Sequence, residues 1–145
     1  MSIVERLRAF LTRTQRSKLE LNDPEFGVIR FASNAWVREL EFHSSEALLY
    51  ISADASGPTD AQRNIWRQTK DALDAIDEAA RDLIRRQCAD ELPTPELNLR
   101  EVWLHSDEHH PREEMMLVYD NPQDFDGIYR ASFLAGRELY AGRDD

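Results

Sequence analysis

The densest group of chemically capable side chains lies between positions 105 and 110, where three of the chain's four histidines occur beside two acidic residues. Neutral imidazoles and carboxylates are ligands that zinc accepts in proteins. His105 and His109 would share a face if the stretch formed a helical turn. His105, His109 and His110 are therefore the candidate site of one alternative function, a metal-binding protein or a metal-dependent hydrolase. Because Pro111 follows and a strand pattern precedes, the sequence favours a solvated connector between strands.

The other sequence motifs that could indicate catalysis or ligand binding are incomplete. Residues 120–127 end like a calcium loop, but the EF-hand frame would place Pro122 and Phe133 at ligating positions, where neither can bind calcium. Cys88 has no histidine near it in sequence to act as a base, so we expect an inert thiol. The glycines are scattered, and neither a phosphate-binding loop nor a nucleophile elbow is present. We therefore expect a protein that is not an enzyme and uses no cofactor.

The charge of the chain indicates which classes of partner to expect. The net charge is −10, which opposes nucleic-acid binding because phosphates require a basic surface. An acidic surface favours solubility, and it also suits a basic protein partner. Glu39, Glu41 and Glu46 are the candidate contacts for such a partner, although a solvated sheet face would explain them equally well.

The first 18 residues differ from the rest in charge. They carry five basic residues and one acidic residue, a net charge of +4, which leaves −14 on the remaining residues. Ser2 and Glu5 have the spacing of a capping box, and apolar residues at helical spacing follow. The pattern predicts an amphipathic helix over residues 1–18 that docks on its own acidic body. A partner or dimer contact and a membrane surface are the alternatives, of which we expect the membrane least.

The longest periodic segment runs from Thr59 to Asp90. Thr59 and Gln62 form a second capping-box pattern after the break at residues 57–58. One face of the segment is apolar over an arc of about 140°, the width of a core-facing stripe. A continuous helix of this length would measure about 48 Å, whereas a compact domain of this size has a radius of gyration of about 15 Å. The helix should therefore overhang the body or break near residues 77–81.

Strand patterns flank this helix on both sides. They lie at residues 26–32, 36–43, 47–53, 97–105, 115–119, 128–134 and 138–141. We expect a turn at residues 22–24, a two-residue hairpin turn at residues 33–34 and a loop at residues 121–127. The predicted fold class is α+β: an antiparallel sheet of six to seven short strands packed against one long central helix, with an extra N-terminal amphipathic helix. We expect a single domain, 1–145, made of the helix at 1–18 and an α+β body at 20–142. Trp36, Trp66 and Trp103 are predicted to lie in the core between sheet and helix, and at least two of the three should be buried.

Three features of the sequence indicate the compartment. No apolar run approaches the ~20 residues that span a bilayer. The N-terminus lacks the apolar core and cleavage site of a secretory signal. A single cysteine fits a reducing environment. We therefore expect a cytoplasmic protein.

Several segments together resemble a known group of small bacterial domains. These are residues 26–29 (Phe-Gly-Val-Ile), Trp36, residues 55–59 (Ala-Ser-Gly-Pro-Thr) and the late run at residues 126–133 (Asp-Gly-Ile-Tyr-Arg-Ala-Ser-Phe). The pattern covers about residues 20–142 and resembles domains grouped with immunity proteins of polymorphic toxin systems. The resemblance implies an intracellular, non-catalytic binding protein that occludes a cationic toxin domain. Two other functions stay open: the metal-dependent one above, and a structural or regulatory subunit that self-associates through the N-terminal helix.

Overall fold

The computed structural model describes residues 2–6, 19–42, 45–105, 114–134 and 137–145. Residues 3–6 are helical. The elements that follow are β1 (Glu20–Asp23), β2 (Gly27–Ala32), β3 (Ala35–Phe42), β4 (Ser45–Ser52), α2 (Asp60–Thr69), the 3-10 turn η2 (Lys70–Ala72), α3 (Leu73–Gln87), β5 (Asn98–Leu104), β6 (Met115–Asn121), β7 (Asp124–Leu134) and β8 (Arg137–Asp144).

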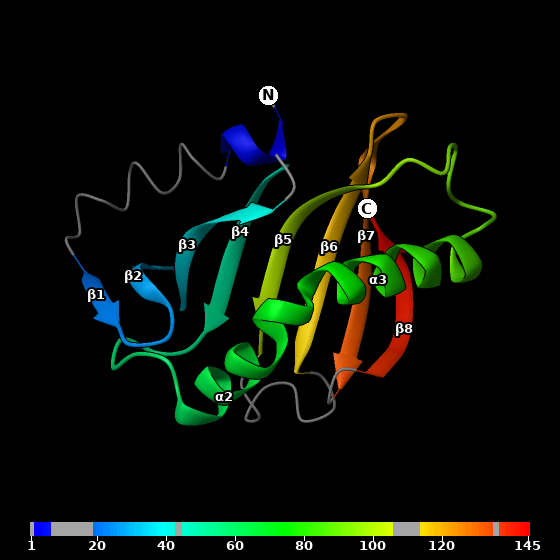
Figure 1. Ribbon diagram of the computed structural model, residues 1–145. Helices are drawn as coiled ribbons and strands as arrows, with labels where there is room; N and C mark the ends of the chain where they lie inside the picture. Colours follow the sequence, from blue (N-terminus) through cyan, green and yellow to red (C-terminus); the bar gives the residue numbers. More distant parts are fainter. Residues whose placement is uncertain (1, 7–18, 43–44, 106–113, 135–136) are drawn as a thin grey trace.

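The described strands form one eight-stranded sheet in the order β1 to β8 (Figure 1). Neighbouring strands are antiparallel except β4 and β5, which are parallel. The parallel pair follows from the connection, because the helical segment between these strands returns the chain to the end of the sheet where β4 began. The predicted α+β fold with an antiparallel sheet of six to seven strands is therefore wrong. The chain is mostly sheet, and the sheet is mixed.

The structure corrects the predicted strands at β1, which the sequence patterns did not indicate, and at the ends of the last two strands. Residues 22–24 were expected to be a turn, but Asn22 and Asp23 pair with β2 as the end of β1. Residues 121–127 were expected to be a loop, yet β7 already begins at Asp124. The short edge strand expected at residues 138–141 is an eight-residue strand. The two-residue hairpin expected at Ser33 and Asn34 is confirmed, and both residues have the positive φ that such turns require.

The central helical segment is not continuous. Its capping box is confirmed: the amide of Gln62 donates to Oγ1 of Thr59 at 3.1 Å, and the amide of Thr59 donates to Oε1 of Gln62 at 3.0 Å. The break, however, lies at η2 and not near residues 77–81. Just before η2 the hydroxyl of Thr69 donates to the carbonyl of Ile65 at 2.7 Å, a contact that commonly bends helices. One long central helix is thus replaced by α2 and α3, which meet at an angle in Figure 1.

Both helices lie on the same face of the sheet, which we call the helix face (Figure 1). Their apolar side chains and those of the helix face make the main core, which contains Trp36 and Trp66 at 1% and 4% exposure. A smaller buried cluster lies on the opposite face, which we call the far face. It consists of Ala32, Ala35, Val37, Leu48 and Tyr50, with partly buried Trp103 against it. The expectation that at least two tryptophans are buried is confirmed.

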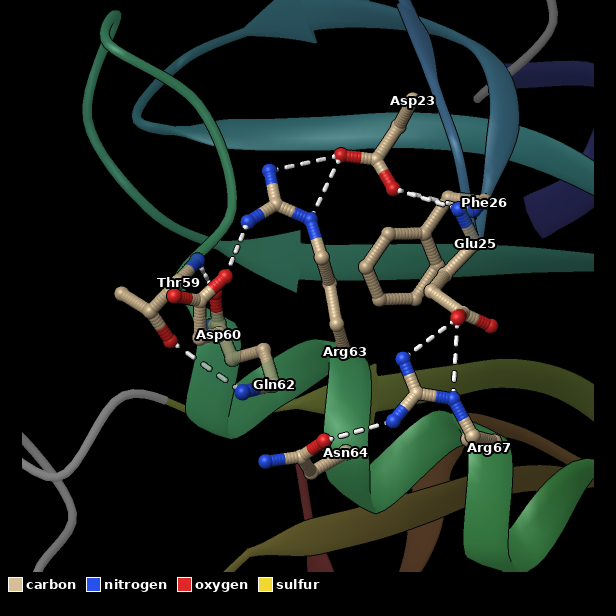
Figure 2. Close-up of polar contacts among 9 residues, drawn as sticks. All are labelled: Asp23, Glu25, Phe26, Thr59, Asp60, Gln62, Arg63, Asn64 and Arg67. Carbon is tan, nitrogen blue, oxygen red and sulfur yellow. Dashed lines mark hydrogen bonds and ion pairs between the residues drawn. The ribbon is translucent and has the colours of Figure 1, made fainter.

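Two arginines of α2 attach the helix to the turn between β1 and β2 (Figure 2). Nε of Arg63 donates to Oδ2 of Asp23 at 2.9 Å, while the other oxygen of Asp23 accepts the amides of Glu25 and Phe26 at 2.9 and 3.1 Å. Arg67 donates to Oε1 of Glu25 at 2.9 Å. Burial disfavours the charged form of Asp23, but the hydrogen bonds from Arg63 and the amides outweigh it and lower the pKa of Asp23.

Helix α3 is attached to the last strand in a similar way. Nη2 of Arg86 lies 2.9 Å from Oε1 of Glu138, and Oε1 of Gln87 accepts the backbone amide of Ala141 at 2.7 Å. Because β8 is an edge of the sheet, this amide has no neighbouring strand to bond. The Gln87 side chain therefore takes the place of a strand at that point.

The predicted N-terminal helix is only partly described. The capping box of Ser2 and Glu5 is confirmed, with Oγ of Ser2 accepting the Glu5 amide at 3.1 Å. Most of the helix expected over residues 1–18 lies outside the described residues. In the part of the chain that the structure covers, no helix is long and apolar enough to span a membrane.

Candidate binding face

One row of side chains crosses the far face over neighbouring strands. The register of the sheet places the following residues side by side: Arg30, Val37, Tyr50, Trp103, Met116, Ser132 and Tyr140. Val37, Tyr50 and Ser132 are buried, whereas Trp103 and Met116 are half-buried and Tyr140 is 48% exposed. Side chains directly opposite one another on neighbouring strands are within contact distance. The far face thus carries an aromatic strip that solvent reaches at Trp103.

The aromatic strip is tightest between β4 and β5. The rings of Tyr50 and Trp103 stack with centroids 4.3 Å apart and an interplanar angle of 6°. The ring of His105 lies 6.2 Å from that of Trp103 on the same strand. Such stacking holds the indole in one orientation. Trp103 is therefore a fixed, partly solvent-accessible ring rather than a core residue of the helix face.

A carboxylate is hydrogen-bonded to this indole. Nε1 of Trp103 donates to Oε1 of Glu101 at 2.8 Å. Burial raises the pKa of Glu101, and the indole hydrogen bond offsets only part of that effect. Burial and then the negative charge of Glu101 also raise the pKa of Tyr50. These directions show that Glu101 and Tyr50 share a poorly solvated environment.

Two arginines of the same part of the sheet, on β5 and β7, already have acidic partners. Nε of Arg100 lies 2.7 Å from Oδ2 of Asp120, and Nε of Arg130 lies 2.6 Å from Oδ2 of Asp144. Among the residues that the structure describes, none forms an ion pair with Glu101, whose one polar contact is the Trp103 indole. Glu101 is thus a half-buried carboxylate to which the described part of the chain supplies no counter-charge.

The three glutamates predicted from the sequence lie together beside this strip. Glu41 and Glu46 are directly opposite one another at the end of the β3–β4 hairpin, and Glu39 is opposite Leu48. All three line a groove of about 140 Å³. Its remaining wall is made by Val4, Leu40, Ala47 and Leu48. Residues 39, 48 and 101 follow one another across β3, β4 and β5, so the hairpin and Glu101 belong to one acidic surface.

The glutamates of the hairpin differ in their environment from Glu101. All three are exposed, and Glu39 and Glu46 each have an interaction partner within the chain. Val4, from the helical start of the chain, is only 5% exposed although it lines the same groove. The groove therefore combines an apolar floor with an acidic rim, which is a chemistry suited to the stem and head of a basic side chain.

The predicted metal ligands are only partly placed. His105 is 6% exposed, and its amide donates to the carbonyl of Glu114 at 3.0 Å. His109 and His110 lie outside the described residues. Within the described ranges, no group of three or more His, Cys, Asp or Glu side chains could hold a metal ion. The metal-dependent alternative stays a prediction that depends on two histidines beyond those ranges.

The other sequence candidates have structural roles. Asp124 does not belong to a calcium loop: its two oxygens lie 2.8 and 2.9 Å from nitrogens of Arg143, and Oδ2 also accepts the hydroxyl of Tyr129. These hydrogen bonds lower the pKa of Asp124 far below its usual value. The Cys88 thiol is buried, and burial followed by the charge of Glu91 raises its pKa. A thiol with a raised pKa is a poor nucleophile, as expected for Cys88.

A larger groove of about 320 Å³ lies along the bend between α2 and α3. It is lined by Ile65, Gln68, Thr69, Ala72, Ala75, Ile76, Ala79 and Glu114. Small and aliphatic residues make most of this wall, and it brings no pair of titratable groups together. This groove therefore has fewer polar and aromatic groups for binding a ligand than the far face has.

Sequence reasoning missed Glu101 and assigned Trp103 to the main core. Leu99, Val102 and Leu104 made this stretch look apolar throughout. The alternation of apolar and polar residues along the strand did not show on which face of the sheet Trp103 would lie. The register shifts between Leu99 and Glu101, which marks a bulge in β5. The bulge lets Leu99 and Val102 share the helix face, and it turns Glu101 and Trp103 to the far face. The available signal was the acidic residue two positions before the indole, since such residues share a face of a strand.

Comparisons with known proteins do not assign the chain to a family. No protein-family model, no curated protein and no solved structure matches it. The resemblance to immunity proteins therefore stays a prediction.

Proposed function

We propose that the chain is a non-catalytic binding protein that holds a basic protein partner against the far face, centred on β3, β4 and β5. In the form that the sequence resemblance implies, the partner is a cationic toxin domain whose active site is covered in the complex. The reducing environment indicated by the lone cysteine makes the cytoplasm the proposed compartment.

The observation that carries the proposal is the acidic and aromatic character of the far face. Glu39, Glu41 and Glu46 rim one groove, and Glu101 continues the acidic surface toward Trp103. The helix face, by contrast, is used by α2 and α3. Tyrosine, tryptophan and charged rims are the usual composition of a protein interface. Opposite charges would also raise the association rate of a basic partner.

The test begins with the genes beside this one: where a neighbour encodes a toxin-type domain, that domain is placed in cells for the assay. The chain is expressed together with that domain, and growth is compared between the native sequence and a variant with Glu39→Lys, Glu41→Lys and Glu46→Lys. We expect the native chain to protect the cells and the variant to lose protection. Loss of complementary charge should also slow association of the purified proteins by about tenfold or more at low salt.

A matched control separates surface position from net charge. Asp71, Glu78 and Asp90 are exposed and lie on α3 or in the segments on either side of it, so their change to lysine alters the net charge equally. This control should protect like the native chain. Because Glu39 and Glu46 have partners within the chain, Glu41→Lys alone serves as a variant with little structural risk. Equal protection by the hairpin and control variants, or no protection by the native chain, would contradict the proposal.

A further inference from the structure

Glu101 stands apart from the other shielded carboxylates of the chain. Asp23, Asp77, Asp120 and Asp124 each have side-chain exposures of 25% or less and each contacts an arginine at 2.7 to 3.0 Å. Glu101 is likewise only partly exposed, but among the described residues its one polar contact is a neutral indole. A carboxylate withdrawn from water without a cation is destabilising, and supplying the cation recovers that cost.

The surroundings of Glu101 fit one kind of cation. The indole of Trp103 is fixed by stacking on Tyr50, and its N–H occupies Oε1 of the carboxylate, so Oε2 is left for a ligand. A guanidinium is planar, stacks on an indole and donates in a fork to carboxylate oxygens. An ammonium lacks the planar face, and it is more strongly hydrated.

We propose that Glu101, Trp103 and Tyr50 form a subsite that receives the guanidinium of an arginine side chain from the partner protein. This inference rests on the proposed function and adds the residue by which the partner is anchored. The arginine enters from the far face, where both Glu101 and Trp103 reach solvent. Its guanidinium stacks on the outer part of the indole and donates to Oε2 of Glu101. Residues of the partner that lie beside this arginine then contact Glu39 and Glu41 of the acidic hairpin.

The raised pKa of Glu101 supports this assignment. Burial without a counter-charge raises it, and a bound guanidinium would lower it again. The nearby cations do not compete, since Arg100 and Arg130 are held by Asp120 and Asp144. A partner arginine would therefore meet a carboxylate that no described residue of the chain neutralises.

The test uses the full chain and short peptides of alternating glycine with arginine, lysine or citrulline. Citrulline keeps the shape of arginine but has no charge. We expect the arginine peptide to bind more tightly than the lysine peptide, and the citrulline peptide not to bind. Trp36 and Trp66 are buried, so a change in tryptophan fluorescence on binding should come from Trp103 and disappear in Trp103→Phe.

Glu101→Gln is the deciding variant, because the amide oxygen can still accept the indole N–H. It should bind the arginine peptide at least about tenfold more weakly, as expected for loss of a charge-assisted hydrogen bond. Its urea midpoint should equal or exceed that of the native chain, which a purely structural role would not produce. Glu78→Gln, on α3, makes the same chemical change away from the far face and should leave binding unchanged.

The contrary outcomes are distinct. Native-like binding by Glu101→Gln would overturn the subsite and leave the basic-partner proposal standing, provided that the hairpin variants bind more weakly. Equal binding of the arginine and lysine peptides would overturn the guanidinium assignment. Failure of the native chain to bind either cationic peptide would overturn the inference. Absence of protection by the native chain in the cell assay would overturn the proposed function separately.

Discussion

Asp23 and Glu101 are two carboxylates that the fold withdraws from water with opposite results. Asp23 lies at the turn before β2, where Arg63 and two backbone amides bind its oxygens, and its pKa is lowered. Glu101 lies on the far face with an indole as its partner, and its pKa is raised. Burial acts in the same direction on both groups. The difference is the presence or absence of hydrogen-bonding cations and amides.

The comparison separates a carboxylate that holds the structure together from one that is available to a ligand. Asp23 has its interactions satisfied inside the chain, and it fixes α2 to the sheet (Figure 2). Glu101 gains little from the folded chain, so its removal should not weaken the fold. Groups with such perturbed ionisation are enriched at functional sites.

The largest effect should come from Asp23→Ala. It removes three hydrogen bonds and leaves Arg63 without its most buried partner, so we expect the free energy of unfolding to fall by about 3 kcal/mol in urea titrations. Asp60→Ala is the control, because Asp60 contacts the same arginine but its side chain is 94% exposed. It should cost less than about 1 kcal/mol. Equal losses for the two variants would contradict a structural role for the buried pair.

Glu101→Gln should change stability in the other direction. The amide keeps the indole contact and removes an uncompensated charge, so the free energy of unfolding at neutral pH should stay constant or rise by about 1 kcal/mol. Urea titration of the variant beside the native chain measures this. A loss of more than about 1 kcal/mol would place Glu101 with the structural carboxylates.

The pH dependence should distinguish the two residues through opposite signs. The folded-state pKa of Glu101 is raised above 4.5, so the native chain gains stability as pH falls through that pKa, and the advantage of Glu101→Gln should shrink toward pH 4.5. The folded-state pKa of Asp23 is lowered below 3.8, so its contribution is present above 3.8 and is lost as pH falls through the folded value. The deficit of Asp23→Ala should thus persist at pH 4.5. If the stability differences of the two variants from the native chain changed in the same way with pH, the proposed contrast between Asp23 and Glu101 would be contradicted.

The smallest effect should come from Glu41→Gln. Glu41 is exposed, and its single charge is screened by salt, so affinity for the arginine peptide should fall only about twofold. The difference from the native chain should vanish in high salt, whereas that of Glu101→Gln should persist in part. If Glu41→Gln weakened binding of the arginine peptide as much as Glu101→Gln does, the hairpin and not Glu101 would be the main contact.

Local patterns predicted the parts of the fold that local chemistry decides. Both capping boxes and the Ser33–Asn34 hairpin formed as expected, because each depends on residues within four positions. The parallel pairing of β4 and β5 depends on where the helical segment returns the chain, and hydrophobic periodicity does not report that. The four residues of β1 include a single apolar side chain, Leu21, so their pattern could not be told from a turn.

The site was predicted in part for the same reason. The acidic hairpin could be read from the alternation in β3, and Glu39, Glu41 and Glu46 do lie together. Glu101 depends on a bulge that shifts the phase of β5 by one residue. It also depends on the fact that no arginine of the described ranges pairs with it. Neither property is written in the spacing of residues along the chain.

The hydrogen bond from the Ala141 amide to Gln87 has a consequence for association. A sheet ordinarily grows by recruiting new strands at its border, and β8 is the longer of the two border strands. By occupying a backbone donor there, α3 makes end-to-end polymerisation of the sheet less favourable. A strand added at β8 would have to forgo this donor or displace Gln87, so that border is a poorer template than a bare edge strand would be.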